Sequence, residues 1–399
     1  MKKLLSVLLC GVLTVGLLAS CSGTPAADAP AQPEPTKEVA DTSADTGTTE
    51  GTTLTKDNIK IGFVHISDPS DMGYTYNHEL GTKEMQEELG LSDDQIISKY
   101  NVPEDSACDA ALRELIDAGC NIIFGTSFGF ENFMLEVAAE YPDIIFCHAT
   151  GYKSGGSGLG NTFNYFASIY EARYLAGIAA GLKTETNKLG YVAAFDFAEV
   201  ISGYTAFYLG AKSVNPDVTM DIMYTNSWNN PTVEAQVSQA LIDRGCDVIS
   251  QHSDSTAPAT TAEENGVWQV GYNNDMIGAA PKASLISARI DWGIYLIEAV
   301  QTVLDGGTIP DHWCKGLNDD AVYLSPLNTD IAAEGTQEAI DKAEAQIKSG
   351  ELKVFSGPLK GTAPDGSTID LAEGEHFAEQ EESSSPSWSY VVEGCTVVQ

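Results

Sequence analysis

Aromatic rings, amides and carboxyl groups recur in short polar stretches that each follow an apolar run of the chain. These stretches contain almost no Lys or Arg. Aromatic side chains stack on the faces of a flat ring, and amide or carboxyl groups pair with the donors and acceptors at its edge. Such chemistry suits a flat, uncharged heterocycle and suits a phosphate or a free carboxylate poorly. The candidate ligand-binding residues are Asp71, Tyr74, Tyr76, Phe128, Trp228, Asp254, Asn273 and Asp275.

Each candidate also has a purely structural alternative. The aromatic candidates could pack on a surface of the fold, and the acidic ones and Asn273 could cap turns or helices. Glu171 is a further binding candidate, although a hydrogen bond at a hinge is its favoured role. We interpret His252 as a structural histidine rather than a ligand contact.

Sequence motifs for catalysis or metal binding are not found. The chain has no nucleophile elbow, P-loop or HExxH, and the glycines of residues 155–160 have the wrong spacing for a dinucleotide-binding loop. No motif pairs a Ser or Cys nucleophile with His65, His148 or His252, and no Cys/His cluster has zinc spacing. We therefore expect a binding protein with no cofactor and no metal, and not an enzyme.

Length and charge narrow the classes further. The 399 residues suffice for two domains, and 43% hydrophobic residues support a sizeable core. Lys and Arg total 21 against 57 Asp and Glu, which gives a net charge of −36. A surface this acidic repels a phosphate backbone, so we expect no nucleic-acid partner.

The N-terminus carries features of an export signal. A basic start, Met1-Lys2-Lys3, precedes an apolar stretch over residues 4–18 that is too short for a comfortable membrane span. The following Leu18-Ala19-Ser20-Cys21 resembles the lipobox of bacterial lipoproteins, in which the cysteine is lipidated; an ordinary signal peptide is the alternative. Residues 22–57 are rich in Ala, Thr, Pro, Asp and Glu, which predicts a disordered tether. We expect residues 1–21 to be a lipoprotein signal segment in which Cys21 is lipidated and becomes the mature N-terminus. The protein would then be anchored on the extracytoplasmic face of the cell membrane.

Six further cysteines could form disulfides in an exported chain. Several of them adjoin apolar runs, where a free thiol behaves as a small buried hydrophobe. Free, buried thiols are therefore the favoured interpretation for Cys108, Cys120, Cys147, Cys246, Cys314 and Cys395.

An internal duplication organises the chain. Lys60-Ile61-Gly62-Phe63-Val64 matches Lys188-Leu189-Gly190-Tyr191-Val192, and the segment from Ile116 to Ile123 resembles that from Ile242 to Ile249. The matches occur in the same order with offsets of about 128 residues, which is too long a period for a solenoid. The duplication predicts two similar lobes.

Within each lobe, apolar runs alternate with segments of helical periodicity, which predicts parallel sheets built from βαβ units. Gly119 and Gly245 stand where helix C-terminal glycines are expected. Two later helices, a short strand at 353–355 and a C-terminal segment at 387–392 that docks back on the body are also expected. The predicted strands are 60–66, 96–100, 121–126, 144–148, 188–195, 219–225, 247–251 and 267–272, and the predicted helices are 76–89, 104–118, 130–140, 200–213, 231–244, 256–265, 292–304 and 334–349.

Several segments together resemble the basic membrane lipoprotein family, which has the type I periplasmic-binding-protein fold and includes purine nucleoside receptors. The likeness covers about residues 58–395. The matching segments are Ile61-Gly62-Phe63-Val64, Asp71-Met72-Gly73-Tyr74-Thr75-Tyr76, Gly125-Thr126-Ser127-Phe128-Gly129, Tyr170-Glu171-Ala172-Arg173-Tyr174-Leu175-Ala176-Gly177 and Gly271-Tyr272-Asn273-Asn274-Asp275-Met276.

The resemblance implies an α/β protein with two Rossmann-like lobes that close on a ligand around a three-crossing hinge. Crossings near residues 166, 285 and 309 give an N-terminal lobe of 58–166 plus 286–308 and a C-terminal lobe of 167–285 plus 309–399. The implied function is a substrate-binding lipoprotein that delivers a purine base or nucleoside to the permease subunits of an ABC importer. We expect a monomer that meets the membrane only through its lipid anchor.

The chain differs from the nucleoside-binding members of this family at two positions that, by the resemblance, would bind the ribose. Nucleoside-binding members carry paired aspartates where this chain has Asn273-Asn274-Asp275, and a later lysine where it has the segment around Arg289. A free base is therefore at least as plausible a ligand as a nucleoside. A sensor that reports ligand to a receptor and a sugar binder of the same fold remain as alternative functions.

Overall fold

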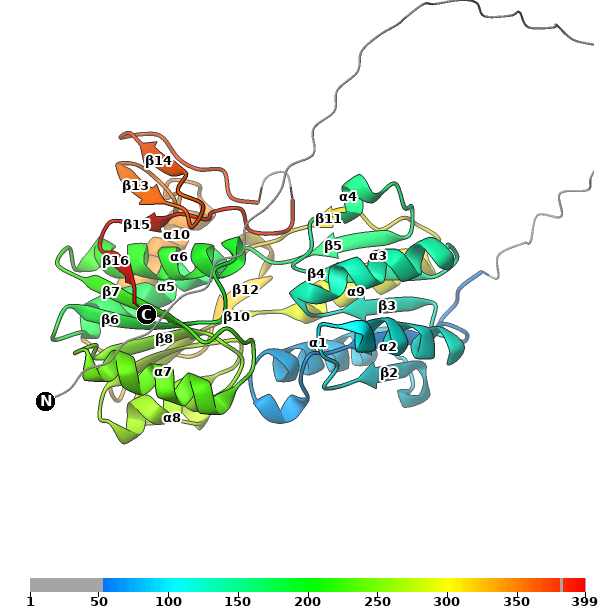
Figure 1. The fold of residues 1–399 in the computed structure, drawn as a ribbon, viewed down its shortest axis with the longest axis horizontal. Coiled ribbons are helices and arrows are strands. Elements are labelled where there is room, and N and C mark those ends of the chain that lie inside the picture. Colours follow the sequence, from blue (N-terminus) through cyan, green and yellow to red (C-terminus); the bar gives the residue numbers. More distant parts are fainter. Residues whose placement is uncertain (1–52, 381–382, 399) are drawn as a thin grey trace, which may run out of the picture. The chain divides into compact units, whose positions relative to one another are not determined.

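The structure of the protein is a computed structural model that describes residues 53–380 and 383–398 (Figure 1). The expected signal segment, Cys21 and most of the expected tether lie outside the described residues. The last residues of that tether form a turn, in which the carbonyl of Thr55 accepts the N–H groups of Asn58 and Ile59. Among the described helices, none combines the length and apolarity needed to cross a bilayer.

The first lobe is built on a parallel sheet with the strand order β11-β5-β4-β3-β1-β2. Side chains on one face of this sheet pack with α1 and α9, and those on the other face pack with α2 and α3. The elements are β1 Ile61–Val64, α1 Tyr74–Leu89, β2 Ile96–Lys99, α2 Ser106–Asp117, β3 Ile122–Gly125, α3 Glu131–Glu140, β4 Ile145–Ala149, α4 Ser154–Ser157, β5 Thr162–Tyr165, α9 Trp292–Leu304 and β11 His312–Trp313.

The second lobe repeats this plan with the strand order β12-β10-β9-β8-β6-β7-β16, in which only β12 runs antiparallel to its neighbour. Helices α5 and α6 pack together, as do α7 and α8. The elements are α5 Ile169–Lys183, β6 Lys188–Ala193, α6 Ala198–Val214, β7 Thr219–Tyr224, α7 Pro231–Asp243, β8 Val248–His252, α8 Ala257–Glu264, β9 Trp268–Tyr272, β10 Ser284–Ile290, β12 Val322–Leu324, α10 Thr336–Lys348 and β16 Cys395–Val397.

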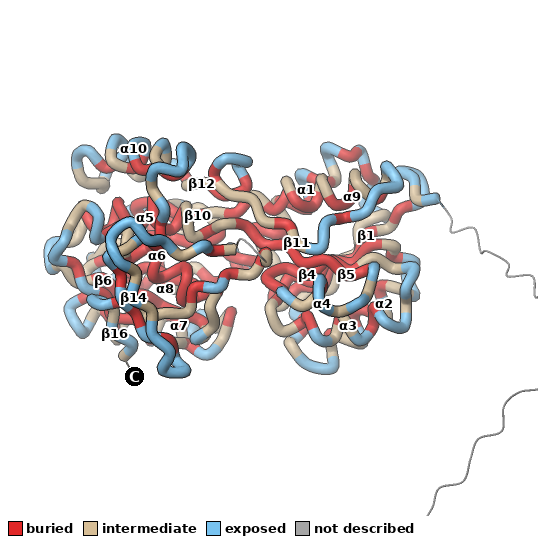
Figure 2. Tube along the Cα trace, turned by 90° about the horizontal axis from the view of Figure 1, so that it is seen from above, coloured by how far each residue is buried: buried red, intermediate tan, exposed pale blue. Residues whose placement is uncertain are grey.

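The central strands are buried along their whole length because helices cover both faces of each sheet (Figure 2). Residues 61 and 63 of β1 join one hydrophobic cluster, while Val64 joins the cluster on the opposite face. Strands covered on two sides need apolar residues at every position, which explains their continuous apolar runs. Gly119 and Gly245 follow α2 and α7 with positive φ angles of 89° and 91°, as expected for glycines that end helices.

Strand pairing differs from the expected lobe boundaries at two places. Residues 286–290 belong to β10, which lies beside β9 in the second sheet rather than in the first lobe. The two-residue strand β11, expected in the second lobe, pairs with β5 in the first sheet. Residues 353–355 form no strand, and instead Val354 and Phe355 bury their side chains against the tail. Runs this short carry too little periodicity to show which sheet edge will accept them.

All six cysteines in the described part of the chain are free, so the prediction of unpaired thiols is confirmed. Four are buried, and Cys314 and Cys395 are half-buried. Burial raises the pKa of the Cys108 thiol to about 12, which keeps it protonated and unreactive near neutral pH.

The C-terminal tail docks on the second lobe, as expected. Strand β16 extends the second sheet beside β7, and β13 Leu359–Thr362, β14 Thr368–Leu371 and β15 Val391–Val392 form a small separate sheet. Trp388 is fully buried and stacks on Phe355, with ring centroids 4.6 Å apart. The buried Glu379 carboxylate accepts hydrogen bonds from the Ser202 hydroxyl of α6 and from the Trp388 N–H.

Replacing Trp388 by alanine is expected to lower the free energy of unfolding by about 3–5 kcal/mol, because the cavity left behind cannot be refilled. Denaturant titration of the two proteins measures this difference. Tyr152, which is 53% exposed, offers an aromatic-to-alanine control that should change stability little. Equal stability of the Trp388 variant and the parent would contradict the account of the tail as part of the core.

Candidate ligand-binding site

A cavity lies between the two lobes, at the C-terminal ends of their strands. Its empty space is about 290 Å³, a figure that includes space open to solvent. Ligands of open parallel sheets collect at this edge. The lining residues are Ile66, Tyr74, Thr126, Ser127, Phe128 and Thr150 of the first lobe, and Glu199, Trp228, His252, Asp254 and Tyr272 of the second.

The lobes touch each other directly beside the cavity. The Asn229 amide donates to the Ser67 hydroxyl at 2.6 Å, and the Asn274 amide donates to the Met72 carbonyl at 3.0 Å. Gly73 approaches the backbone of Asp254 so closely that a Cβ atom there would overlap the Asp254 carbonyl oxygen. The structure therefore represents a closed arrangement of the lobes.

The first lobe contributes two aromatic rings to the cavity, Tyr74 and Phe128. Tyr74 donates its hydroxyl to the Thr126 carbonyl at 2.6 Å, and its ring meets Trp292 edge-on at 6.0 Å. Phe128 stacks on Phe197 of the second lobe, with ring centroids 4.8 Å apart. These contacts leave Tyr74 as a rigid ring at the cavity and make Phe128 a contact between the lobes.

The second lobe contributes Trp228 to the cavity lining, and this residue is 9% exposed. Its ring meets Phe195 edge-on at 5.0 Å, and its backbone carbonyl accepts the N–H of Asp254 at 2.9 Å. The indole N–H has no partner in the described structure. Trp228 therefore brings an aromatic ring to the cavity lining and carries an N–H donor that no protein group in the described structure uses.

The carboxyl groups of Asp254 and Glu199 are at the cavity. Neither forms a salt bridge with a Lys or Arg among the described residues. Burial raises the pKa of Asp254 well above its usual range, and the charges of Asp71 and Glu234 raise it further. Burial also raises the pKa of Glu199, to about 8, against the opposing effect of the Arg173 cation. Burial therefore shifts both groups toward their uncharged forms.

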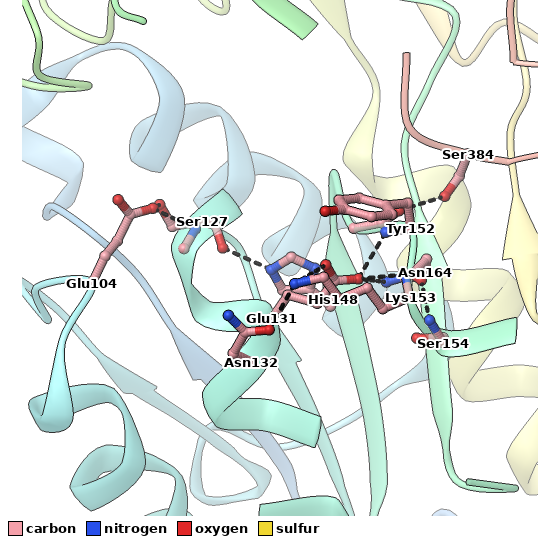
Figure 3. Close-up of polar contacts among 12 residues, drawn as sticks. Glu104, Ser127, Glu131, Asn132, His148, Tyr152, Lys153, Ser154, Asn164 and Ser384 are labelled. Carbon is pink, nitrogen blue, oxygen red and sulfur yellow. Dashed lines mark hydrogen bonds and ion pairs between the residues drawn. The ribbon is translucent and has the colours of Figure 1, made fainter. Parts of the chain in front are cut away.

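A buried polar network supports the loops of the first lobe (Figure 3). One oxygen of Glu131 accepts the N–H groups of Tyr152 and Lys153 at 2.7 and 2.8 Å and the Asn164 amide at 3.2 Å. These bonds fix the chain directly after Thr150, which lines the cavity with a φ angle of 65°. A β-branched residue rarely adopts a positive φ angle. The network of hydrogen bonds around Glu131 therefore stabilises a backbone conformation of Thr150 that threonine alone disfavours.

Residues 58–356 match the family described as ABC transporter substrate-binding proteins, PnrA-like. The chain belongs to this family. It is 36% identical over 312 residues to the purine-binding protein of Brucella abortus. The alignment covers 78% of this chain and 87% of that protein. A putative ABC transporter glucose-binding protein of Haloferax volcanii is 34% identical over 335 residues, covering 80% of this chain and 83% of the relative.

The fold is shared more widely. An ABC transporter solute-binding protein from Aeropyrum pernix aligns with a TM-score of 0.63 at 17% sequence identity, over 75% of this chain and 94% of that chain. The expected family and the periplasmic-binding-protein fold are thus confirmed. The protein is a substrate-binding protein of an ABC transporter, with a small-molecule ligand and permease partners, and it is not an enzyme.

The structure of this substrate-binding protein brings some of the predicted residues to the cavity and keeps others away. Those that line it are Tyr74, Phe128, Trp228 and Asp254. Those that do not line it are Asp71, Tyr76, Glu171, Asn273 and Asp275.

The residues outside the cavity mostly have structural partners. Asp71 accepts the N–H groups of Gly73, Thr75 and Tyr76 and so caps α1, while Asp275 accepts the N–H of Ile277. Glu171 accepts the N–H of Leu317 at 2.8 Å, which agrees with its favoured role at the hinge. These contacts match the structural alternatives that the sequence left open.

Asn273 and Tyr76 have no such explanation. Asn273 is buried, its φ is 67°, and its side-chain amide has no partner in the described structure. Tyr76 is half-buried. Neither side chain reaches the cavity lining.

Sequence reasoning missed part of the lining. His252, interpreted as structural, is the last residue of β8 and faces the cavity, and Tyr272 holds the same position on β9. Glu199 lies in the first turn of α6, beyond the loop after β6. Its signal was available, because an acid that begins the helix after a parallel strand stands at the ligand-binding edge of the sheet.

Proposed function

We propose that the protein binds a purine in the cavity between its lobes and delivers it to an ABC importer. The observation that carries this proposal is the pairing of Tyr74 and Trp228, one ring from each lobe, around a cavity whose described lining includes no Lys or Arg. A purine ring stacks well on such faces, and the unpaired Trp228 N–H and the Glu199 and Asp254 carboxyl groups suit its edge. The relative from Brucella abortus, named as purine-binding, supports the same ligand class.

A free base is favoured over a nucleoside. Arg289, which lies where the family resemblance implies a lysine, donates to the Asn273 carbonyl and to the Asn77 side chain, both at 3.1 Å. The Arg289 guanidinium therefore already has hydrogen-bond partners within the protein. Neither Arg289 nor Asn273 lines the cavity, which favours a ligand without a ribose.

A sugar is the second candidate ligand, because the relative from Haloferax volcanii is named as a putative glucose-binding protein. Aromatic rings also stack on sugars, and carboxyl groups bind their hydroxyls. Burial raises the pKa of both cavity carboxyl groups, and a carboxyl group in its uncharged form pairs with the donor–acceptor edge of a purine.

Mass spectrometry of small molecules released from the purified, undialysed protein tests the ligand class directly. The proposal predicts a purine base in the released fraction and its absence from a parallel preparation of Trp228→Ala. Release of a hexose with no purine would contradict the proposal.

We also propose that Cys21 carries the lipid and that the protein works as a monomer on the extracytoplasmic face of the cell membrane. Replacing Cys21 by alanine is expected to move the protein from the membrane fraction to the medium or to leave it unprocessed. Membrane fractionation and the mass of the mature N-terminal peptide measure this outcome. A variant that keeps the same lipidated product would contradict the anchor.

A further inference from the structure

Glu199 is a cavity-lining acid with one buried carboxyl oxygen that has no partner in the described structure. It lies in the first turn of α6, its residue is 6% exposed, and it lines the cavity. One carboxyl oxygen lies 3.4 Å from Nε2 of His252 but without the alignment of a hydrogen bond, and the other oxygen has no partner. A buried polar atom left unpaired is costly, so this carboxyl group is expected to find its partner in a bound molecule.

The groups packed around Glu199 leave it without a counter-ion. Arg173 of α5 donates to the Tyr191 hydroxyl at 2.6 Å and to the Gln251 carbonyl at 2.9 Å, and its guanidinium lies 3.8 Å from the centre of the Tyr272 ring. Arg173 forms no ion pair with any described carboxylate. The buried Arg173 cation acts on Glu199 only at longer range.

Titratable neighbours do not supply a charge either. Burial lowers the pKa of His252 well below its usual range, and Arg173 lowers it further, so the ring is neutral at pH 7. Tyr74 and Tyr272 stay protonated because burial raises the pKa of each hydroxyl. Asp254 and the more distant Glu104 are acids, and Glu104 adds to the rise in the pKa of Glu199 to about 8.

An uncharged carboxyl group has a hydroxyl donor and a carbonyl acceptor side by side. Its complement is an edge with one acceptor and one donor at the same spacing, as in a lactam or an amidine. Purines with a 6-oxo or a 6-amino group present such an edge at N1 and the 6-substituent. Unsubstituted purine lacks it there and keeps only the N3/N9–H edge that free purine bases share. A carboxylate, by contrast, could only accept.

We propose that Glu199 is the residue that selects the ligand, pairing in its uncharged form with a lactam or amidine edge through one donated and one accepted hydrogen bond. This inference rests on the proposed binding of purines in the same cavity. It adds a specificity residue and the chemical class of edge that the residue recognises.

Comparison of Glu199→Gln with Glu199→Ala tests the inference, because glutamine keeps one donor and one acceptor but cannot ionise. Calorimetry with adenine at pH 6.5 is expected to show at most a threefold loss for Glu199→Gln and a loss of about ten- to a hundredfold for Glu199→Ala. Unsubstituted purine should bind the wild type more weakly than adenine, by a margin that shrinks in Glu199→Ala. Asp196→Asn is the matched control, since Asp196 is an exposed acid in the loop that leads into α6.

The pH profile supplies a second readout. Wild-type affinity for adenine is expected to hold from pH 6 to 7.5 and to fall about tenfold per unit above pH 8, as Glu199 loses the proton that the ligand needs. The fall should be smaller in Glu199→Gln, in which Asp254 is the remaining cavity acid with a raised pKa. Without ligand, wild-type stability should fall between about pH 5 and 8, because the folded state holds a proton that the unfolded chain has released, and this slope should be smaller in Glu199→Gln.

The outcomes separate the inference from the proposed function. A loss in Glu199→Gln as large as in Glu199→Ala, or a wild-type affinity that is flat or rises above pH 8, overturns the role of Glu199 while purine binding stands. Absence of purine binding by the wild type overturns the proposed function and this inference with it. If melting curves show that Glu199→Ala fails to fold, Glu199→Gln and its two pH profiles decide the question.

Discussion

Replacing Gly73 by alanine is expected to weaken ligand binding by about ten- to a hundredfold, since overpacking costs roughly 1–3 kcal/mol. A Cβ atom at this position would overlap the carbonyl oxygen of Asp254 across the boundary between the lobes. The overlap exists only when the lobes are closed, so the substitution should penalise the bound, closed state and spare the open one. Calorimetry measures the affinity, and solution scattering measures whether ligand still reduces the radius of gyration.

Gly156→Ala is the matched control, because nothing lies within 4 Å of the Cβ position there. It should bind ligand like the parent. If Gly73→Ala bound ligand as tightly and compacted as fully as the parent protein, the contact between Gly73 and Asp254 would not belong to the ligand-bound state.

Replacing Trp228 by alanine is expected to weaken purine binding by about ten- to a hundredfold, because stacking on one ring is worth roughly 1–3 kcal/mol. Trp228→Phe keeps a smaller ring face and loses the unpaired indole N–H, so it should show a smaller loss than alanine. Calorimetry with adenine measures both. The backbone carbonyl that accepts the Asp254 N–H is present in both variants, which limits indirect effects on that loop.

Trp268 provides a control for the loss of an indole. It is half-buried at the start of β9, where Lys183 lies 3.9 Å from its ring centre, and it does not line the cavity. Trp268→Ala should leave adenine affinity within about twofold. Equal binding by Trp228→Ala and the parent would remove Trp228 from the site and with it the stacking of the ligand between two rings.

Most of the fold could be predicted because its sheets are covered on both faces. Continuous apolar strands such as β3 and the glycines after α2 and α7 are local signals in the sequence. Because the chain contains a duplication, the elements predicted for the first lobe could also be predicted for the second. The edge strands could not be placed in the same way. β11 has two residues and β16 has three. Which strand each of them pairs with depends on the sheet edges that are free once the rest of each lobe has assembled.

The site was predictable as a set of loops but not as a set of side chains. Asp71 and Asp254 both follow a strand, yet Asp71 turns to the amides that begin α1 while Asp254 faces the cavity. The sequence cannot distinguish these cases, because a carboxylate near a helix start has capping bonds available wherever the helix actually begins. Glu199 and His252 needed the packing of two lobes before their exposure to the cavity could be seen.

Calorimetric titration of the ligand-free protein with adenine, guanine, hypoxanthine, adenosine, guanosine and glucose tests the central claim most directly. The account predicts one site per chain, tightest binding by a free base, weaker binding by the nucleosides and no measurable binding of glucose. Tight binding of glucose with no binding of any purine would contradict it.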